Sequence, residues 1–242
     1  MIQAVAFDLD DTLYDEVDYC RSGFQAVAEF LASPPAQSAE TILEVLWRQF
    51  SSGNRTKTFN AALDALGIKY SAGGCLPADE DLIQTLVHVY RNHRPQISLP
   101  KDSKKVLAQL GSEYELGLIT DGFLPAQKLK VQALGIEKYF KAIIYTEELG
   151  REFWKPSPAG FQKLMEVLNC GAEAIVYVAD NETKDFIGPN KLGITTIQIL
   201  RPLRLHRQDG LRHTESSDLA NAAARFRIGS IQELPTLMTQ MP

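Results

Sequence analysis

Two aspartates one residue apart, Asp8 and Asp10, stand at the end of an apolar run near the start of the chain. In an extended segment alternate side chains share a face, so the two carboxylates project together while Leu9 turns toward apolar packing. Two carboxylates this close cannot both ionise comfortably without a cation, so the pair indicates a metal ion, a shared proton or both. The alternative is a solvated aspartate-rich turn, since aspartate is common in turns and at helix N-termini.

Three further segments with reactive side chains follow. The first, an apolar run at 116–119, is followed by a threonine, an aspartate and a glycine. The second is a lysine followed by a proline, at 155–156, and the third is an apolar run at 175–179 that is followed by carboxylates. The glycine lets backbone N–H groups approach an anion closely, and the proline restricts the lysine before it to an extended backbone. The side chains concerned are Thr120, Asp121 and Gly122, then Lys155, then Asp180 and Asp185.

The four segments together resemble the haloacid dehalogenase (HAD) superfamily, and the chain is identified as a phosphatase-type member with a helical cap inserted after the first segment. The resemblance covers essentially the whole chain. Two positions depart from the usual pattern: Asp121 stands where relatives often have asparagine, and Ala179 where they typically have glycine. The first departure adds a carboxylate near the site, and the second removes no ligand.

The resemblance implies magnesium-dependent transfer of a phosphoryl group to Asp8. Asp10 gives a proton to the leaving alkoxide and later takes one from the water that hydrolyses the aspartyl-phosphate. The implied Mg²⁺ ligands are the carboxylates of Asp8 and Asp180 and the backbone carbonyl of Asp10, while Asp185 supports them without binding the metal. The implied catalytic residues are Asp8, Asp10, Thr120 and Lys155, and the residues that bind the substrate phosphate are Asp8, Leu9, Asp10, Thr120, Asp121, Gly122 and Lys155.

Strand-like runs alternate with helical patterns, which predicts a parallel sheet with helices on both faces. The reactive residues follow the carboxyl ends of strands, where ligands bind in open α/β sheets. The expected class is α/β, with a Rossmann-like doubly wound core formed by residues 1–14 and 98–242. The strand-like runs lie at about 3–8, 115–119, 142–145, 175–179 and 195–200, with a short one near 226–229.

Residues 15–97 carry only helical patterns, and we expect them to form a separate cap domain. Four apolar stripes recur at helical spacing, which predicts a bundle of four amphipathic helices. A bundle inserted after the nucleophile can hinge on its connections, 13–16 and 95–100, and close over a small substrate. The stripes are Phe24, Val27, Ala28 and Leu31; Ile42, Leu43, Leu46, Trp47 and Phe50; Phe59, Ala62, Leu63 and Leu66; and Leu82, Ile83, Leu86, Val87 and Tyr90.

Composition excludes several classes of function. The chain has 242 residues and a formal net charge of -5, opposite in sign to the basic footprint of a general nucleic-acid binder. No apolar stretch approaches the roughly 20 residues of a membrane span, and no signal-peptide pattern precedes the first strand, so a cytoplasmic protein without nucleic-acid or membrane partners is expected. The cysteines are odd in number and far apart, which indicates free thiols rather than disulfides or a zinc site; they are Cys20, Cys75 and Cys170.

The sequence therefore predicts a phosphatase that hydrolyses a small-molecule phosphomonoester and exists as a monomer or homodimer. A phosphorylated sugar or sugar acid is favoured as substrate, with a nucleoside monophosphate next, because relatives with this cap arrangement act on such compounds. A phosphosugar mutase and a dehalogenase are alternatives, although dehalogenases of the family lack the second aspartate, which is present here as Asp10. A non-enzymatic regulatory module with the same fold is a further alternative.

Two groups of basic residues have no assigned role. Arg21, Arg55 and Lys57 in the cap could contact an anionic part of the substrate, although exposed lysines and arginines are common on any surface. The basic segment 201–213 follows a strand that ends at the catalytic face. This segment is either a mobile surface loop or a positive region that steers an acidic substrate or meets a partner subunit.

Overall fold

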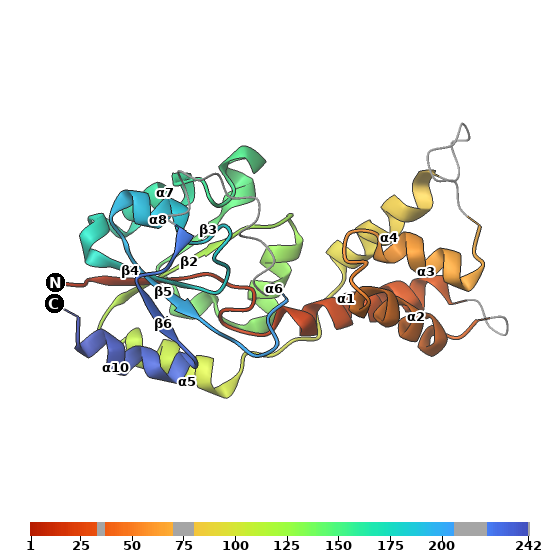
Figure 1. The fold of residues 1–242 in the computed structure, drawn as a ribbon, viewed down its shortest axis with the longest axis horizontal. Helices are drawn as coiled ribbons and strands as arrows, with labels where there is room; N and C mark the ends of the chain where they lie inside the picture. The colour runs from red at the N-terminus through yellow and green to blue at the C-terminus, as the bar shows by residue number, and fades with distance from the viewer. Residues whose placement is uncertain (33–36, 70–79, 206–221, 242) are drawn as a thin grey trace. The chain divides into compact units, whose positions relative to one another are not determined.

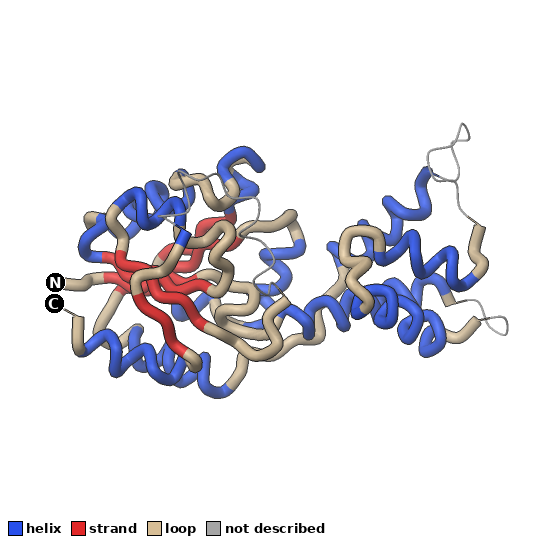
Figure 2. Tube along the Cα trace, in the orientation of Figure 1, coloured by secondary structure: helices blue, strands red, loops and turns tan. Residues whose placement is uncertain are grey.

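The computed structural model divides the chain into two compact units. One consists of Met1–Val17 and Ser98–Pro242, and the other of Asp18–Ile97. All of the described strands belong to the first unit, and the described part of the second is helical (Figures 1 and 2). Among the residues described, no helix has the length and apolar character needed to span a bilayer. The residues described are 1–32, 37–69, 80–205 and 222–241.

The larger unit is built on a six-stranded parallel sheet with the order β3-β2-β1-β4-β5-β6. The chain runs outward from β1 in both directions, so the strand order reverses between β1 and β4, where α/β sheets bind their ligands. The central strands are buried along their whole length, as expected for apolar strands covered on both faces. The strands are β1 (Ala4–Phe7), β2 (Glu115–Thr120), β3 (Ala142–Tyr145), β4 (Ile175–Ala179), β5 (Thr195–Ile199) and β6 (Phe226–Ile228).

Helices cover both faces of this sheet (Figure 1). Helices α7 and α8 pack on one face, where α7 contacts β2 and β3 and α8 contacts β5. Helices α5 and α10 pack together on the other face. The predicted α/β class with a doubly wound parallel sheet is therefore confirmed. The helices are α5 (Lys101–Leu110), α6 (Ala126–Leu134), α7 (Ala159–Leu168), α8 (Ile187–Leu192) and α10 (Leu234–Thr239).

The described residues of the smaller unit form four helices, and most of the residues in the apolar stripes of the sequence face its interior. Phe24 lies at the centre of an aromatic cluster, with ring centroids 5.3 Å from Phe50, 6.1 Å from Phe59 and 5.5 Å from Tyr90. Such edge-to-face and tilted pairs add to the stabilisation that comes from burial. The helices are α1 (Glu16–Leu31), α2 (Ala39–Ser51), α3 (Thr58–Leu66) and α4 (Glu80–Asn92).

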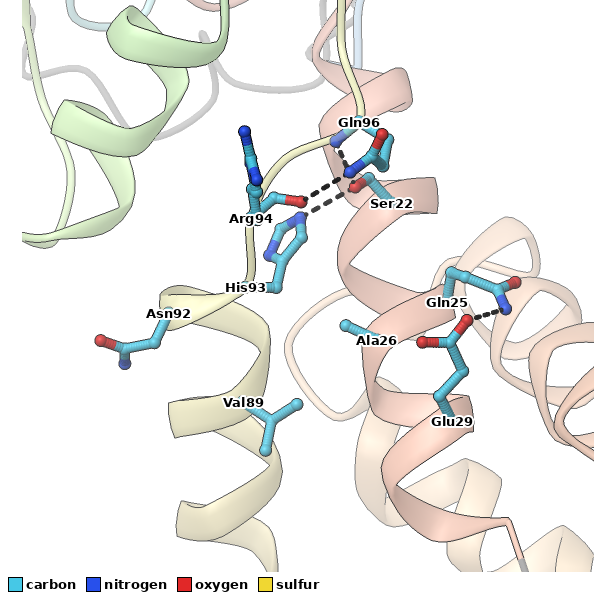
Figure 3. A pocket seen from close by; sticks show the side chains of 9 residues that line it. All are labelled: Ser22, Gln25, Ala26, Glu29, Val89, Asn92, His93, Arg94 and Gln96. Atoms are coloured by element: carbon cyan, nitrogen blue, oxygen red, sulfur yellow. Dashed lines mark hydrogen bonds between the residues drawn. The ribbon is translucent and has the colours of Figure 1, made fainter.

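A pocket of about 600 Å³ lies within the helical unit, between α1 and the end of α4 (Figure 3). Its polar side chains bond to one another: the Ser22 hydroxyl accepts from the backbone N–H of Gln96 at 2.8 Å and lies 3.0 Å from the His93 ring. Because these groups satisfy each other, they brace the segment after α4 against α1. The lining residues are Ser22, Gln25, Ala26, Glu29, Val89, Asn92, His93, Arg94 and Gln96.

Candidate active site

The candidate site is assembled at one edge of the sheet. Asp8 directly follows β1, Thr120 ends β2 and Asp180 directly follows β4, while Lys155 lies in the connection between β3 and α7. Phe7, at the end of β1, pairs with Leu118 of β2 on one side and with Val178 of β4 on the other. Because parallel strands bring their carboxyl ends to the same edge, segments that are far apart in sequence meet there.

Asp8 is 4% exposed and is held from two directions. The Lys155 ammonium donates to Asp8 Oδ1 at 2.5 Å, and the Thr12 hydroxyl reaches Oδ2 at 3.4 Å. Burial raises the pKa of Asp8 to about 7; the Lys155 ammonium opposes this shift and the Asp185 carboxylate adds to it. Further positive charge at this position therefore favours the ionised form of Asp8.

Lys155 is the cation at the centre of the site. Its ammonium lies 2.7 Å from Asp185 Oδ1 and donates to the Tyr177 hydroxyl at 3.1 Å, in addition to its bond with Asp8. Burial alone would lower the pKa of Lys155, but Asp185 and Asp8 outweigh it and hold the pKa well above its ordinary value. Lys155 is thus a fixed positive charge beside Asp8.

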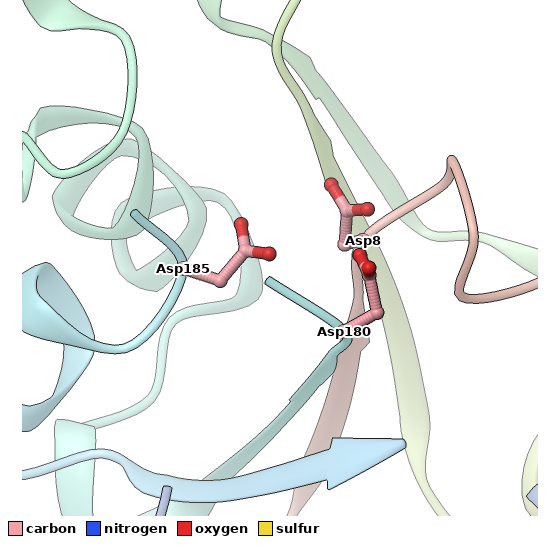
Figure 4. Close-up of side chains that lie close together, drawn as sticks. All are labelled: Asp8, Asp180 and Asp185. Atoms are coloured by element: carbon pink, nitrogen blue, oxygen red, sulfur yellow. The ribbon is translucent and has the colours of Figure 1, made fainter. Parts of the chain in front are cut away.

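Three carboxylates, those of Asp8, Asp180 and Asp185, present oxygens that lie within 4.8 Å of one another (Figure 4). Asp180 Oδ2 is buried and has no hydrogen-bond partner among the described residues. Burial, then Asp185 and Asp8, raise the pKa of Asp180 to about 9. A buried carboxylate oxygen without a donor, facing other carboxylates, has the chemistry of a ligand for a hard divalent cation such as Mg²⁺.

Asp185 differs from Asp180 because it forms an ion pair with a buried lysine and accepts a backbone hydrogen bond. Oδ1 faces the Lys155 ammonium and Oδ2 accepts from the backbone N–H of Asn181 at 3.0 Å. Burial favours the protonated form, but Lys155 and Lys184 outweigh it and lower the pKa of Asp185. This environment suits the supporting position expected for Asp185 from the sequence, which stays a prediction.

Asp10 has an environment separate from that of Asp8. Lys130 Nζ lies 2.8 Å from both oxygens, Gln127 Nε2 donates at 3.0 Å and the Tyr14 hydroxyl donates at 2.5 Å. Burial alone would raise the pKa of Asp10, but the Lys130 ammonium and these hydrogen bonds lower it overall. Leu9, between the two aspartates, is fully buried as the sequence suggests.

The loop after β2 contributes a hydroxyl and a constrained glycine. Thr120 Oγ1 is buried without a hydrogen-bond partner in the described part of the chain, so it can donate to an anion. The Asp121 carboxylate, by contrast, accepts from the Thr146 hydroxyl at 2.7 Å and from the backbone N–H of Lys155 at 3.2 Å. The side chain of Asp121 therefore fixes the segment that carries Lys155.

Replacing Gly122 with alanine is expected to cost about 3 kcal/mol of unfolding free energy, since strain and a steric clash combine. Gly122 has a φ of 138°, and an added Cβ would lie 2.9 Å from Cγ of Gln127, which is itself tied to Asp10. Gly67→Ala is the control: its φ is also positive but an added Cβ meets nothing, so about 1 kcal/mol is expected. Urea unfolding measures both, and equal losses would contradict the clash.

The described part of the basic segment 201–213 bonds to the protein itself. Arg204 donates to the backbone carbonyl of Asp180 at 3.4 Å, and the backbone N–H of Leu205 donates to Asp11 at 2.6 Å. Residues 206–213 lie outside the described residues. Arg201 donates to the carbonyls of Thr12 and Leu13, to Asp15 at 3.2 Å and to the Ser103 hydroxyl at 2.9 Å. Arg201 thus holds the chain that follows the first two aspartates.

Two of the cap arginines considered as substrate contacts lie against aromatic rings of the helical unit. The Arg21 guanidinium is 4.6 Å from the Trp47 ring centroid, and that of Arg55 is 5.6 Å from the Phe50 ring centroid. Lys57 is exposed at the start of α3. Stacking of this kind is a common use of arginine on a protein surface.

Sequence patterns missed several residues that contact the reactive side chains, among them Tyr14, Gln127, Lys130, Thr146 and Tyr177. Gln127 and Lys130 are three residues apart on α6, which places them on one helix face. That spacing was the available signal, but nothing in the sequence shows that this face meets Asp10. Tyr177 lies within an apolar strand and reads as a core residue.

The fold and the site define a doubly wound α/β protein with a cluster of buried acids at the switch point of its sheet. Residues 5–199 match the haloacid dehalogenase-like hydrolase family, and the chain belongs to that family.

Similar proteins of established activity include phosphatases that match the chain over its whole length. Glyceraldehyde 3-phosphate phosphatase of Methanocaldococcus jannaschii is 28% identical over 247 residues, covering 100% of this chain and 99% of that protein. N-acylneuraminate-9-phosphatase of Homo sapiens is 27% identical over 248 residues, covering 98% of this chain and 94% of that protein. The predicted membership of the superfamily, with a phosphatase-type chain that hydrolyses phosphoric monoesters, is confirmed.

A solved structure supports the fold. The 2-haloacid dehalogenase of Pseudomonas syringae pv. Tomato DC3000 superposes with a TM-score of 0.62 and 24% sequence identity, covering 99% of each chain. At this identity the likeness concerns the fold and not the reaction.

Proposed function

We propose that this protein releases phosphate from a phosphorylated sugar or sugar acid, with nucleoside monophosphates as the second substrate class, through an aspartyl-phosphate on Asp8. The observation that carries the proposal is that Asp8 and Asp10 are each held by a buried lysine of their own, Lys155 and Lys130. Two carboxylates in separate environments can take two roles, one as nucleophile and the other as acid and base. Against the effect of burial, Lys130 lowers the pKa of Asp10 in the free protein, so Asp10 takes up its proton when the negative charge of the bound phosphate ester raises that pKa. The sugar-phosphate and sugar-acid-phosphate activities of the relatives support the substrate class.

In the proposed mechanism an Asp8 oxygen attacks phosphorus, and the bond from phosphorus to the ester oxygen breaks. Asp10 passes its proton to that departing oxygen, which leaves as an alcohol. Water then attacks the phosphorus of the aspartyl-phosphate and gives a proton back to Asp10. The bond between phosphorus and the Asp8 oxygen breaks, which restores the Asp8 carboxylate and releases inorganic phosphate. Lys155 and the Thr120 hydroxyl, which is buried and available to donate, offset the charge on the phosphoryl oxygens.

Mg²⁺ fits the donor set that the site presents. Its ligands would be the carboxylates of Asp8 and Asp180 and the backbone carbonyl of Asp10, with Asp185 supporting them. When bound, Mg²⁺ would supply positive charge that favours ionised Asp8 and balances the phosphoryl oxygens. The unpaired, buried Asp180 oxygen supports this assignment.

The helical part of the chain is proposed to act as a cap. We assign residues 1–14 and 98–242 to the catalytic core and residues 15–97 to the cap, which would exclude water and select the substrate. The proposed location is cytoplasmic. Among the described residues Cys20 and Cys170 form no disulfide, as expected in a reducing compartment, and Cys75 lies outside the described residues. The proposed partner is the small-molecule substrate, with the protein acting as a monomer or homodimer.

The main competing function is that of a dehalogenase, which needs a nucleophilic aspartate but no acid for an alkoxide. The three donors around Asp10 favour the phosphatase, because a dehalogenase has no use for a second oriented carboxyl group. A mutase also keeps this group and differs only in its product.

Phosphate release from a substrate panel tests the proposed function. The panel contains sugar phosphates, sugar-acid phosphates, nucleoside monophosphates and p-nitrophenyl phosphate, each with Mg²⁺ or with EDTA. We expect Mg²⁺-dependent release, fastest with a sugar or sugar-acid phosphate. Isomerised sugar phosphate without free phosphate would indicate a mutase, and halide release from a 2-haloacid would indicate a dehalogenase. A folded protein inert toward all of these compounds would contradict the proposal.

A further inference from the structure

Lys130 is a buried lysine that lies outside the four segments singled out in the sequence. It belongs to α6, and its side chain is only 4% exposed. Burying an ammonium is costly unless carboxylates and hydrogen bonds compensate it, so its partners reveal why it is there. Those partners are Asp10, contacted at 2.8 Å through both oxygens, and Glu16 at 3.6 Å.

Charge compensation of two acids would by itself explain a lysine at this position. Gln127 does not fit that explanation, because it is neutral and yet lies one helical turn before Lys130 and contacts the same carboxylate. Its Nε2 atom donates to Asp10 Oδ2 at 3.0 Å and to the backbone carbonyl of Asp121 at 2.5 Å. A neutral donor can orient a carboxyl group but does not compensate its charge. The bond from Gln127 therefore indicates that the orientation of the Asp10 carboxyl group is controlled.

The bonds of Gln127 also connect two parts of the site. Asp121 directly follows Thr120, the residue with the unpaired hydroxyl, while Asp10 follows the nucleophile strand. Gln127 therefore ties the Asp10 carboxyl group to the loop that carries the Thr120 hydroxyl. Tyr14, four residues after Asp10, donates to Asp10 Oδ1. Both oxygens of Asp10 are therefore held by donors, one from the segment after β1 and the others from α6.

We propose that Lys130 and Gln127 are positioning residues that hold the Asp10 carboxyl group in register with the phosphate-binding loop, so that α6 sets the geometry of proton transfer. This inference rests on the proposed function, in which Asp10 protonates the leaving oxygen and then accepts a proton from water. Neither residue touches the phosphoryl group. Both act through Asp10.

The need for a correctly oriented Asp10 depends on the leaving group of the substrate. An alkoxide needs a proton as its bond to phosphorus breaks, whereas p-nitrophenolate is a stable anion that departs without one. The second step, attack of water on the aspartyl-phosphate, needs Asp10 as a base for every substrate. Loss of positioning should therefore slow both steps with an alkyl phosphate, but only the second step with p-nitrophenyl phosphate.

The test compares Lys130→Met and Gln127→Met with the native protein and with Lys128→Met. Lys128 is on the same helix, is 52% exposed and pairs with Glu148, so it controls for loss of a lysine from α6. Steady-state turnover is measured with the sugar phosphate that the native protein hydrolyses fastest. Rapid mixing with p-nitrophenyl phosphate and Mg²⁺ then measures the burst of nitrophenolate and the slower rate that follows it.

For Lys130→Met we expect turnover of the sugar phosphate to fall roughly 10²-fold, near the low end of general acid–base contributions. The nitrophenolate burst should keep its native rate, approach one equivalent per protein and be followed by a slowed steady state, because aspartyl-phosphate accumulates. Gln127→Met should show the same pattern with a smaller loss. Lys128→Met should behave as the native protein does.

Two results would overturn the inference. Variants that match the native protein on both substrates would show that orientation of Asp10 needs neither residue. Variants that lose sugar-phosphate turnover and burst amplitude in parallel would show a structural role, since misfolding removes sites for all substrates alike.

If Lys130→Met does not fold because Asp10 and Glu16 are left without their lysine, the result for Gln127→Met decides, since that substitution changes no charge. A native protein that hydrolyses no phosphate ester would instead defeat the proposed function, before any variant is compared.

Discussion

Asp8→Asn is expected to abolish phosphate release, with a loss of roughly 10³-fold or more, as is usual when an enzyme loses its nucleophile. The amide oxygen can still accept the Lys155 hydrogen bond, so the fold should survive. An amide does not attack phosphorus, and no aspartyl-phosphate can form. Phosphate release from a sugar phosphate and trapping of the phosphorylated protein after acid quench measure the two effects.

The matched control is Asp64→Asn, which makes the same chemical change at an exposed position on α3. It should retain native turnover and native phosphoprotein levels. Residual activity above one-tenth of native in Asp8→Asn, with the protein folded, would assign the nucleophile to another group. Loss of activity in both variants would point to a general effect of the substitution and not to Asp8.

The sheet and the position of the reactive residues at its edge could be predicted because both depend on local patterns. Continuous apolar runs mark buried parallel strands, and reactive residues directly after them lie at the carboxyl edge wherever the strands pair. For that reason Asp8, Thr120 and Asp180 could be placed before the strand order was known. The predicted helical segments of residues 15–97 likewise follow from the spacing of their apolar residues.

The supporting residues could not be predicted because their roles depend on which helix face meets which loop. Lys128 and Lys130 look alike in the sequence, yet one is exposed on the surface and the other is buried against Asp10. Asp121 was expected among the phosphate-binding residues, and the structure shows its carboxylate bonded to Thr146 and the backbone of Lys155. A single sequence carries no signal for such contacts between distant segments.

Asp180→Asn should stabilise the protein in EDTA while removing its response to Mg²⁺. Asp180 has its pKa raised from 3.8 to about 9, mainly by burial and then by Asp185 and Asp8. Between these values the folded state binds a proton that the unfolded state has lost, so each pH unit of increase destabilises the metal-free protein by up to about 1.4 kcal/mol. Asparagine cannot ionise and removes this penalty.

The advantage of Asp180→Asn over the native protein in EDTA should therefore grow as the pH rises from 6 to 8, as measured by urea unfolding. With saturating Mg²⁺ the order should reverse, because bound metal stabilises only the folded state that can hold it. Glu113→Gln removes an exposed acid and should show neither effect. An unchanged Mg²⁺ stabilisation in Asp180→Asn would exclude Asp180 as a ligand. A metal-free variant less stable than native at pH 8 would mean that the buried amide costs more than the repulsion it relieves. Opposite signs with and without metal are what separate a metal ligand from a residue that merely packs in the core.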